Sequence, residues 1–130
     1  MNQRMRVLVT EDDSKTREFL GSMLSHKGYS VTYAGNGEEA LEIIKEQDFG
    51  AILMDIMMPG LNGEETAWTL KGYLKNRTPI IAVTALQMNP SLLIKLGIKE
   101  LVPKPIMANR LFEAIERVTK VAMSSRIACA

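Results

Sequence analysis

Charged and hydroxyl side chains follow four of the apolar runs in this sequence, each at the point where a run ends. Glu11 and Asp12 follow the first run, Asp55 the third, Thr84 closes the fourth, and Lys104 comes after the fifth. In an open α/β sheet, ligands bind outside the carboxyl ends of the strands. If the runs are parallel strands, three acids, one hydroxyl and one amine gather at one edge of the sheet.

This set of side chains is suited to phosphoryl transfer. Clustered carboxylates repel one another unless a cation lies among them, and Mg²⁺ prefers oxygen ligands, commonly one or two carboxylates together with a phosphate. A carboxylate also acts as a nucleophile toward phosphorus, which makes Asp55 the candidate acceptor. Lys104 and Thr84 would supply the positive charge and the hydrogen-bond donor that the phosphoryl oxygens need.

Short apolar runs predict the strands that position these residues; they begin at residues 7, 31, 51, 80 and 101. The runs at 7, 51 and 80 are continuous, which is typical of strands covered by helices on both faces. Apolar residues recur at helical spacing within 19–24, 40–44, 66–74, 92–96 and 111–122. The alternation predicts a doubly wound α/β domain with a five-stranded parallel sheet. The flavodoxin-like strand order 2-1-3-4-5 would bring Glu11 and Asp12 beside Asp55.

Four motifs in this order resemble those of response-regulator receiver domains: LVTEDDSKTREFL, ILMDIMMPGLNGEE, PIIAVTA and VPKPI. The resemblance spans nearly the whole chain. It implies a phospho-accepting domain of a two-component or phosphorelay pathway, with Mg²⁺ as its cofactor. By this resemblance Glu11, Asp12 and Asp55 bind the metal, and the backbone carbonyl of Met57 completes its shell.

The resemblance also implies which residues handle the phosphoryl group. Asp55 aligns with the phosphoacceptor, Thr84 with the switch hydroxyl and Lys104 with the lysine of the family motif. The backbone amide of Ala85 is expected to contact the phosphoryl oxygens. In relatives the Lys-Pro bond is commonly cis, so a cis peptide bond is predicted between Lys104 and Pro105.

The partner implied by the resemblance is a sensor histidine kinase or a histidine phosphotransfer protein, and the phosphorylated domain would switch an output surface. It would be a signalling module and not an enzyme, monomeric or dimerising on phosphorylation. One alternative is a Mg²⁺-dependent phosphohydrolase with an aspartate nucleophile; that class has a second Asp two residues after the nucleophile, where this chain has Met57. Another is a pseudoreceiver that binds partners without phosphorylation.

Composition and charge limit the partners and the cellular location that the sequence predicts. The chain has 130 residues and a formal charge of +1, so no bulk charge points to direct nucleic-acid or membrane binding. Its single cysteine, Cys129, allows no internal disulfide, and acids follow the first apolar run at once, which excludes a signal peptide there. A cytoplasmic receiver domain over 1–123 is expected, with 124–130 as a flexible tail or linker remnant.

Three residues carry a second interpretation. Asp13 is expected to cap the helix that follows and not to bind metal. Glu11 stands where relatives often have Asp, which puts the metal affinity in question. Leu101 occupies a place where many relatives carry an aromatic switch residue, so the readout of phosphorylation is expected to differ from the aromatic type.

Overall fold

The computed structural model describes residues 4–56, 63–74, 78–85 and 87–129, and the side chains of 63, 64 and 120–129 are not described. Five parallel strands form one sheet in the order β2-β1-β3-β4-β5. They are β1 (Arg6–Thr10), β2 (Ser30–Ala34), β3 (Ala51–Met54), β4 (Ile80–Thr84) and β5 (Ile98–Pro103). The predicted fold class and strand order are confirmed.

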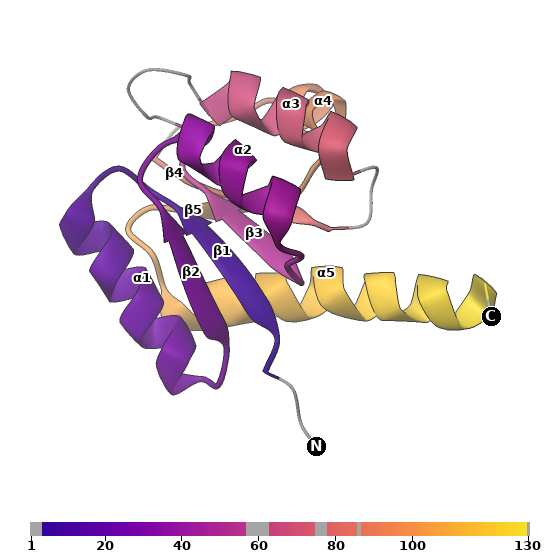
Figure 1. Cartoon of the computed structure of the whole chain (residues 1–130), viewed down its shortest axis with the longest axis horizontal. Helices are drawn as coiled ribbons and strands as arrows, with labels where there is room; N and C mark the ends of the chain where they lie inside the picture. The colour runs from indigo at the N-terminus through magenta and orange to yellow at the C-terminus, as the bar shows by residue number, and fades with distance from the viewer. Residues whose placement is uncertain (1–3, 57–62, 75–77, 86, 130) are drawn as a thin grey trace.

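Helices cover both faces of the sheet (Figure 1). They are α1 (Ser14–His26), α2 (Gly37–Glu46), α3 (Gly63–Leu74), α4 (Pro90–Leu96) and α5 (Ala108–Cys129). Alternate residues of β1 face opposite layers: Leu8 packs with α2, α3 and α4, whereas Val7 and Val9 pack with α1 and α5. This double burial explains the continuous apolar runs.

Helix boundaries follow local chemistry. Asn36 caps α2 by accepting from the amide of Glu39 at 2.8 Å, and the carboxylate of Glu39 accepts in return from the amide of Gly35 at 3.1 Å. Asn89 caps α4, Pro90 opens it, and Gly97 ends it in the left-handed conformation with φ 75°.

The structure differs from the sequence expectations at two ends. β5 begins at Ile98, before the predicted run at 101. The sequence pattern did not indicate this start because Lys99 and Glu100 interrupt the apolar run. The register with β4 shifts there: Ile80 pairs with Ile98 and Ile81 with Glu100. α5 continues to Cys129, so residues 124–129 of the predicted tail are helical, and Figure 1 shows this helix running out beyond the sheet.

Candidate phosphorylation site

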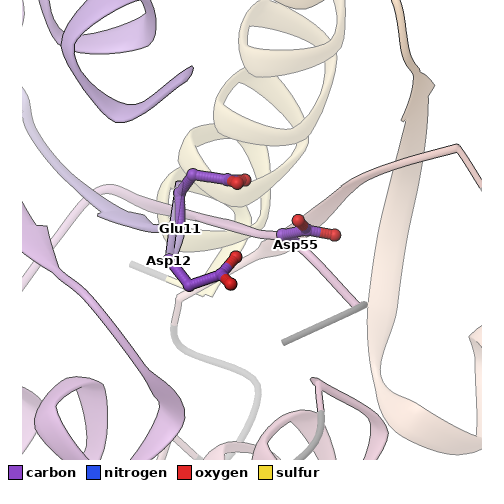
Figure 2. Close-up of side chains that lie close together, drawn as sticks. All are labelled: Glu11, Asp12 and Asp55. Carbon is purple, nitrogen blue, oxygen red and sulfur yellow. The ribbon is translucent and has the colours of Figure 1, made fainter. Parts of the chain in front are cut away.

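The acidic residues meet at the carboxyl ends of β1 and β3 (Figure 2). Thr10 pairs with Met54 at the end of the two strands, and the amide of Asp55 donates to the Thr10 carbonyl at 3.0 Å. Glu11 and Asp55 therefore leave neighbouring strands at the same level. One carboxylate oxygen from each of Glu11, Asp12 and Asp55 lies within 4.8 Å of the others, as the sequence predicted.

Glu11 and Asp55 are buried, with 1% and 4% of their surface exposed, whereas Asp12 faces solvent. The backbone of Glu11 is held on two sides: its amide donates to the Ala34 carbonyl at 3.0 Å, and its carbonyl accepts from Arg17 Nη1 at 3.0 Å. The backbone that carries Glu11 is thus held in place, and the exposed Asp12 leaves the pocket open to water.

Lys104 reaches this pocket from the end of β5. Its Nζ lies 3.0 Å from Asp55 Oδ2 and 3.3 Å from Glu11 Oε2, and its amide donates to the Thr84 carbonyl at 3.0 Å. The peptide bond between Lys104 and Pro105 is cis, as predicted. One ammonium group therefore balances part of the negative charge of two buried acids.

The charges in the pocket shift one another's pKa values. Burial, followed by the negative charge of Asp55, raises the pKa of Glu11 from 4.5 to about 7, against the opposing effect of Lys104. Burial lowers the pKa of Lys104, but its hydrogen bond to Asp55 and the charges of Asp55 and Glu11 outweigh that effect and raise it. One lysine thus leaves the buried acids with uncompensated repulsion.

The donor set fits Mg²⁺. All three converging ligands are carboxylate oxygens, and no histidine or cysteine belongs to the group that the described residues form. Burial and the charge of Asp55 raise the pKa of Glu11, and a bound cation would oppose both effects by stabilising the carboxylate form. Met57, whose carbonyl was expected to complete the metal shell, lies outside the described residues.

Two further predicted site residues stand at the end of β4. Thr84 is fully buried and its carbonyl anchors the backbone of Lys104, while Ala85, the next residue, is exposed. β3 and β4 pair as far as Met54 and Ala82, so both residues lie at the same carboxyl edge as Asp55. Their contacts with a phosphoryl group remain predictions.

Asp13 is a helix cap, as expected. Its Oδ2 accepts from the amide of Thr16 at 2.9 Å and from the Thr16 hydroxyl at 2.6 Å. These bonds lower the pKa of Asp13. Two adjacent acids, Asp12 and Asp13, therefore have different surroundings: only Asp12 shares the carboxylate cluster.

Sequence reasoning missed Arg17. Its guanidinium crosses from α1 to the carbonyl of Glu11, which braces the turn that carries the acidic pair. The spacing of six residues from Glu11 and the exposed neighbours Lys15 and Glu18 make it look like an ordinary solvated helix residue. Nothing in the one-dimensional pattern distinguishes it.

The family model for the response regulator receiver domain matches residues 7–116. The chain belongs to this receiver family. In sequence the receiver domain is similar to the response regulator MprA of Mycobacterium tuberculosis, at 36% identity over 121 residues that cover 89% of this chain and 52% of MprA. It spans about half the length of the regulators it matches in this way.

Two solved structures show the same likeness. The chemotaxis protein CheY4 of Vibrio cholerae is 26% identical with a TM-score of 0.82, covering 89% of this chain and 99% of CheY4. The response regulator TrrA of Thermotoga maritima, solved in complex with Mg²⁺ and BeF, is 32% identical with a TM-score of 0.80, covering 88% of this chain and 98% of TrrA.

These findings establish a receiver domain of two-component signalling, a signalling phosphoacceptor and not a turnover enzyme. Its acidic pocket of Glu11, Asp12 and Asp55 is suited to phosphorylation and is typical of the Mg²⁺ site of receivers. The phosphohydrolase alternative is thereby set aside. No helix in the described part of the chain is long and apolar enough to cross a membrane.

Proposed function

We propose that Asp55 accepts a phosphoryl group from the phosphohistidine of a cognate histidine kinase or histidine phosphotransfer protein. The observation that carries this proposal is the 3.0 Å contact between Lys104 Nζ and Asp55 Oδ2, beside the carboxylates of Glu11 and Asp12. A buried carboxylate that is held by an ammonium group and faces a cation site has what an acyl-phosphate acceptor needs.

Each residue of the site has a separate role in the transfer. An oxygen of Asp55 attacks phosphorus, an O–P bond forms, and the P–N bond to the donor histidine breaks with its electron pair returning to the imidazole nitrogen. The ammonium group of Lys104, which contacts the Asp55 carboxylate before the transfer, then contacts a phosphoryl oxygen. The hydroxyl of Thr84 and the amide of Ala85 donate to the other phosphoryl oxygens.

Glu11, Asp12, Asp55 and the carbonyl of Met57 would hold Mg²⁺, which neutralises negative charge on the carboxylates and on the transferred group. The raised pKa of Glu11 is consistent with this assignment, because burial and the charge of Asp55 both disfavour its carboxylate form and a divalent cation would stabilise that form. Arg17 keeps the Glu11 backbone in place for this role.

Phosphorylation would be read out at the face formed by α4 and β5. Leu101, on β5, packs against the core layer that contains Leu96 and Ile98, together with Met88 and Leu92. A change at Thr84 would reach this apolar group through β4 and β5, which pair in register from Ile81 and Glu100 to Thr84 and Pro103. The readout would therefore be a repacking of aliphatic side chains and not the swing of an aromatic ring.

The proposed receiver unit is 1–123, and the helical residues 124–129 would connect it to an output partner or domain. We place it in the cytoplasm, where a histidine kinase would reach it, as a monomer or as a dimer formed on phosphorylation. Direct nucleic-acid binding is not proposed for this unit, because its net charge is only +1.

The test is phosphorylation by acetyl phosphate in Mg²⁺, followed by intact mass, with Asp55→Asn beside the wild type. We expect one phosphoryl adduct that hydroxylamine removes and that the variant lacks. If the wild type gives no adduct with acetyl phosphate or with a panel of phosphorylated histidine donors, and does not bind Mg²⁺, the protein is a pseudoreceiver and the proposal is wrong.

A further inference from the structure

A second cavity lies at the amino edge of the sheet, where the strands begin, and thus at the opposite edge from Asp55. Its volume is about 760 Å³. Its walls come from the start of β1, the end of α2 with the segment leading to β3, the end of α3, and Thr78 just before β4. Small-molecule sites commonly have volumes of about 300–1,000 Å³, so this cavity has the size of a ligand site.

The cavity is lined by more cations than acids. Arg4, Arg6 and Lys45 line it, and Asp48 is the one acid among its described lining residues. Lys45 lies in the last turn of α2 and pairs with Glu42 at 3.3 Å. A basic residue is favoured at the C-terminal end of a helix, which explains the presence of Lys45 without a ligand. No helix end accounts for Arg4 and Arg6, which precede and open β1, and Arg4 has no ion pair within the described part of the chain.

Arg6 is held in a defined place. Its guanidinium lies over the ring of Phe49, 5.1 Å from the centroid, and its Nη2 donates to the side-chain oxygen of Gln47. A guanidinium has five N–H donors, and this contact uses one. The remaining donors belong to a planar group that matches phosphate and carboxylate oxygens and whose position is already set by stacking.

A flat apolar surface stands beside these cations. Tyr73, at the end of α3, lines the cavity and keeps 49% of its surface exposed, with Lys45 Nζ 5.6 Å from its ring centroid. An exposed aromatic ring in a concave, cationic site can stack with a flat ring of a ligand. Anion recognition and ring recognition are thus brought together in one cavity.

We propose that this cavity binds a phosphate-bearing small molecule with a flat ring, of the nucleotide class. Arg4 and Arg6 hold the phosphate and Tyr73 stacks on the ring. We take the ligand to be a small molecule because the cavity is a half-open hollow with the volume of a ligand site. The site does not depend on phosphorylation of Asp55, which lies at the other edge of the sheet.

Titration with AMP in EDTA, followed by amide NMR shifts, tests the site directly. We expect the largest shifts at Gly50, Thr78 and Tyr73, whereas adenosine and inorganic phosphate, each lacking one half of the ligand, bind at least about tenfold more weakly. The double variant Arg4→Gln/Arg6→Gln should lose about tenfold or more in affinity for AMP. Arg110→Gln, which removes an exposed arginine from α5, is the matched control and should bind as the wild type does.

Several results would overturn the proposal. One is the absence of amide shifts at the cavity with millimolar AMP. Another is equal affinity of the double variant and the wild type for AMP. A third is that the wild type binds AMP and inorganic phosphate with equal affinity. Shifts centred on Lys104 would mean that AMP binds at the acidic site instead. Asp55→Asn should bind AMP normally, so a failure of the phosphoacceptor proposal is separable from a failure of this one.

Discussion

At the carboxyl edge of the sheet, Glu11 and Asp55 are buried and share one ammonium group, whereas at the amino edge Arg4 and Arg6 are exposed and face a hollow. The two edges have opposite charge excesses, and their charges differ in environment. Burial makes the acidic pocket sensitive to every added or removed charge. The basic cavity lies in solvent, so single changes there should have smaller effects.

The largest effect is expected from Lys104→Met, which removes the only ammonium group bonded to Asp55 in the described part of the chain. The rate of phosphorylation by acetyl phosphate should fall about hundredfold, because the phosphoryl oxygens lose a preorganised donor. Lys99→Met, which removes an exposed lysine from β5, the strand that precedes Lys104, should leave the rate unchanged. A Lys104→Met rate within about threefold of the wild type would contradict a charge-balancing role.

Two helix glycines also differ in packing: Gly37 is buried at the start of α2 after the carboxyl end of β2, whereas Gly72 is exposed near the end of α3. A methyl group on Gly37, at the start of α2, would lie 2.0 Å from Thr66 Oγ1, whereas one on Gly72, in α3, meets nothing within 4 Å. Gly37→Ala should lower the free energy of unfolding by about 1–3 kcal/mol, and Gly72→Ala should raise it by up to about 1 kcal/mol. Urea denaturation checks both, and a similar change in the two variants would remove the contrast.

The acidic edge could be predicted because each of its residues lies at or within a few residues of the end of an apolar run. Once the order of the strands is inferred, Glu11, Asp12, Asp55 and Lys104 must converge. The basic cavity could not be predicted in this way. Its residues come from separate segments near 4–6, 44–50, 73–74 and 78, and each has an ordinary interpretation as a strand start, helix end or loop residue.

Two other features lay beyond sequence reasoning for different reasons. Arg17 makes its contact with a backbone carbonyl, and a carbonyl has no signature in a sequence. The length of α5 was underestimated because Ser124 and Ser125 interrupt the apolar spacing, although serine does not end a helix by itself.

The third prediction concerns pH and follows from the raised pKa of Glu11. Mg²⁺ binding requires the carboxylate form, so the affinity should rise about tenfold between pH 6 and pH 8 as Glu11 loses its proton near pH 7. Glu11→Gln should bind Mg²⁺ more weakly and lose most of this pH dependence. A wild-type affinity that is flat over this interval would show that Glu11 is already ionised at pH 6.

The same shift has a consequence for stability without metal. A carboxyl group whose folded pKa is raised contributes stability below its unfolded pKa and loses it as the pH rises through the folded value. For Glu11 this loss of stability takes place between about pH 4.5 and about pH 7. The metal-free wild type should therefore lose about 1 kcal/mol between pH 6 and pH 8 relative to Glu11→Gln, measured by urea denaturation in EDTA.

The smallest effect distinguishes the roles of the two neighbouring aspartates, Asp12 and Asp13. Asp13→Ala should cost about 1 kcal/mol of stability, because the capping bonds to Thr16 are lost, and should leave the Mg²⁺ affinity unchanged. Asp12→Ala should do the reverse, lowering the Mg²⁺ affinity with little effect on stability. If Asp13→Ala also weakened Mg²⁺ binding by tenfold or more, the assignment of the metal ligands would need revision.

The most direct test of the account is whether a phosphoryl analogue binds at Asp55 only together with Mg²⁺. Fluoride and beryllium can be added to the protein and the bound species followed by ¹⁹F NMR, with the Glu11→Gln and Asp55→Asn variants alongside. The account predicts a bound signal for the wild type in Mg²⁺, a weaker one for Glu11→Gln, and none for Asp55→Asn or for the wild type in EDTA. A bound signal that persists in Asp55→Asn, or that needs no Mg²⁺, would contradict it.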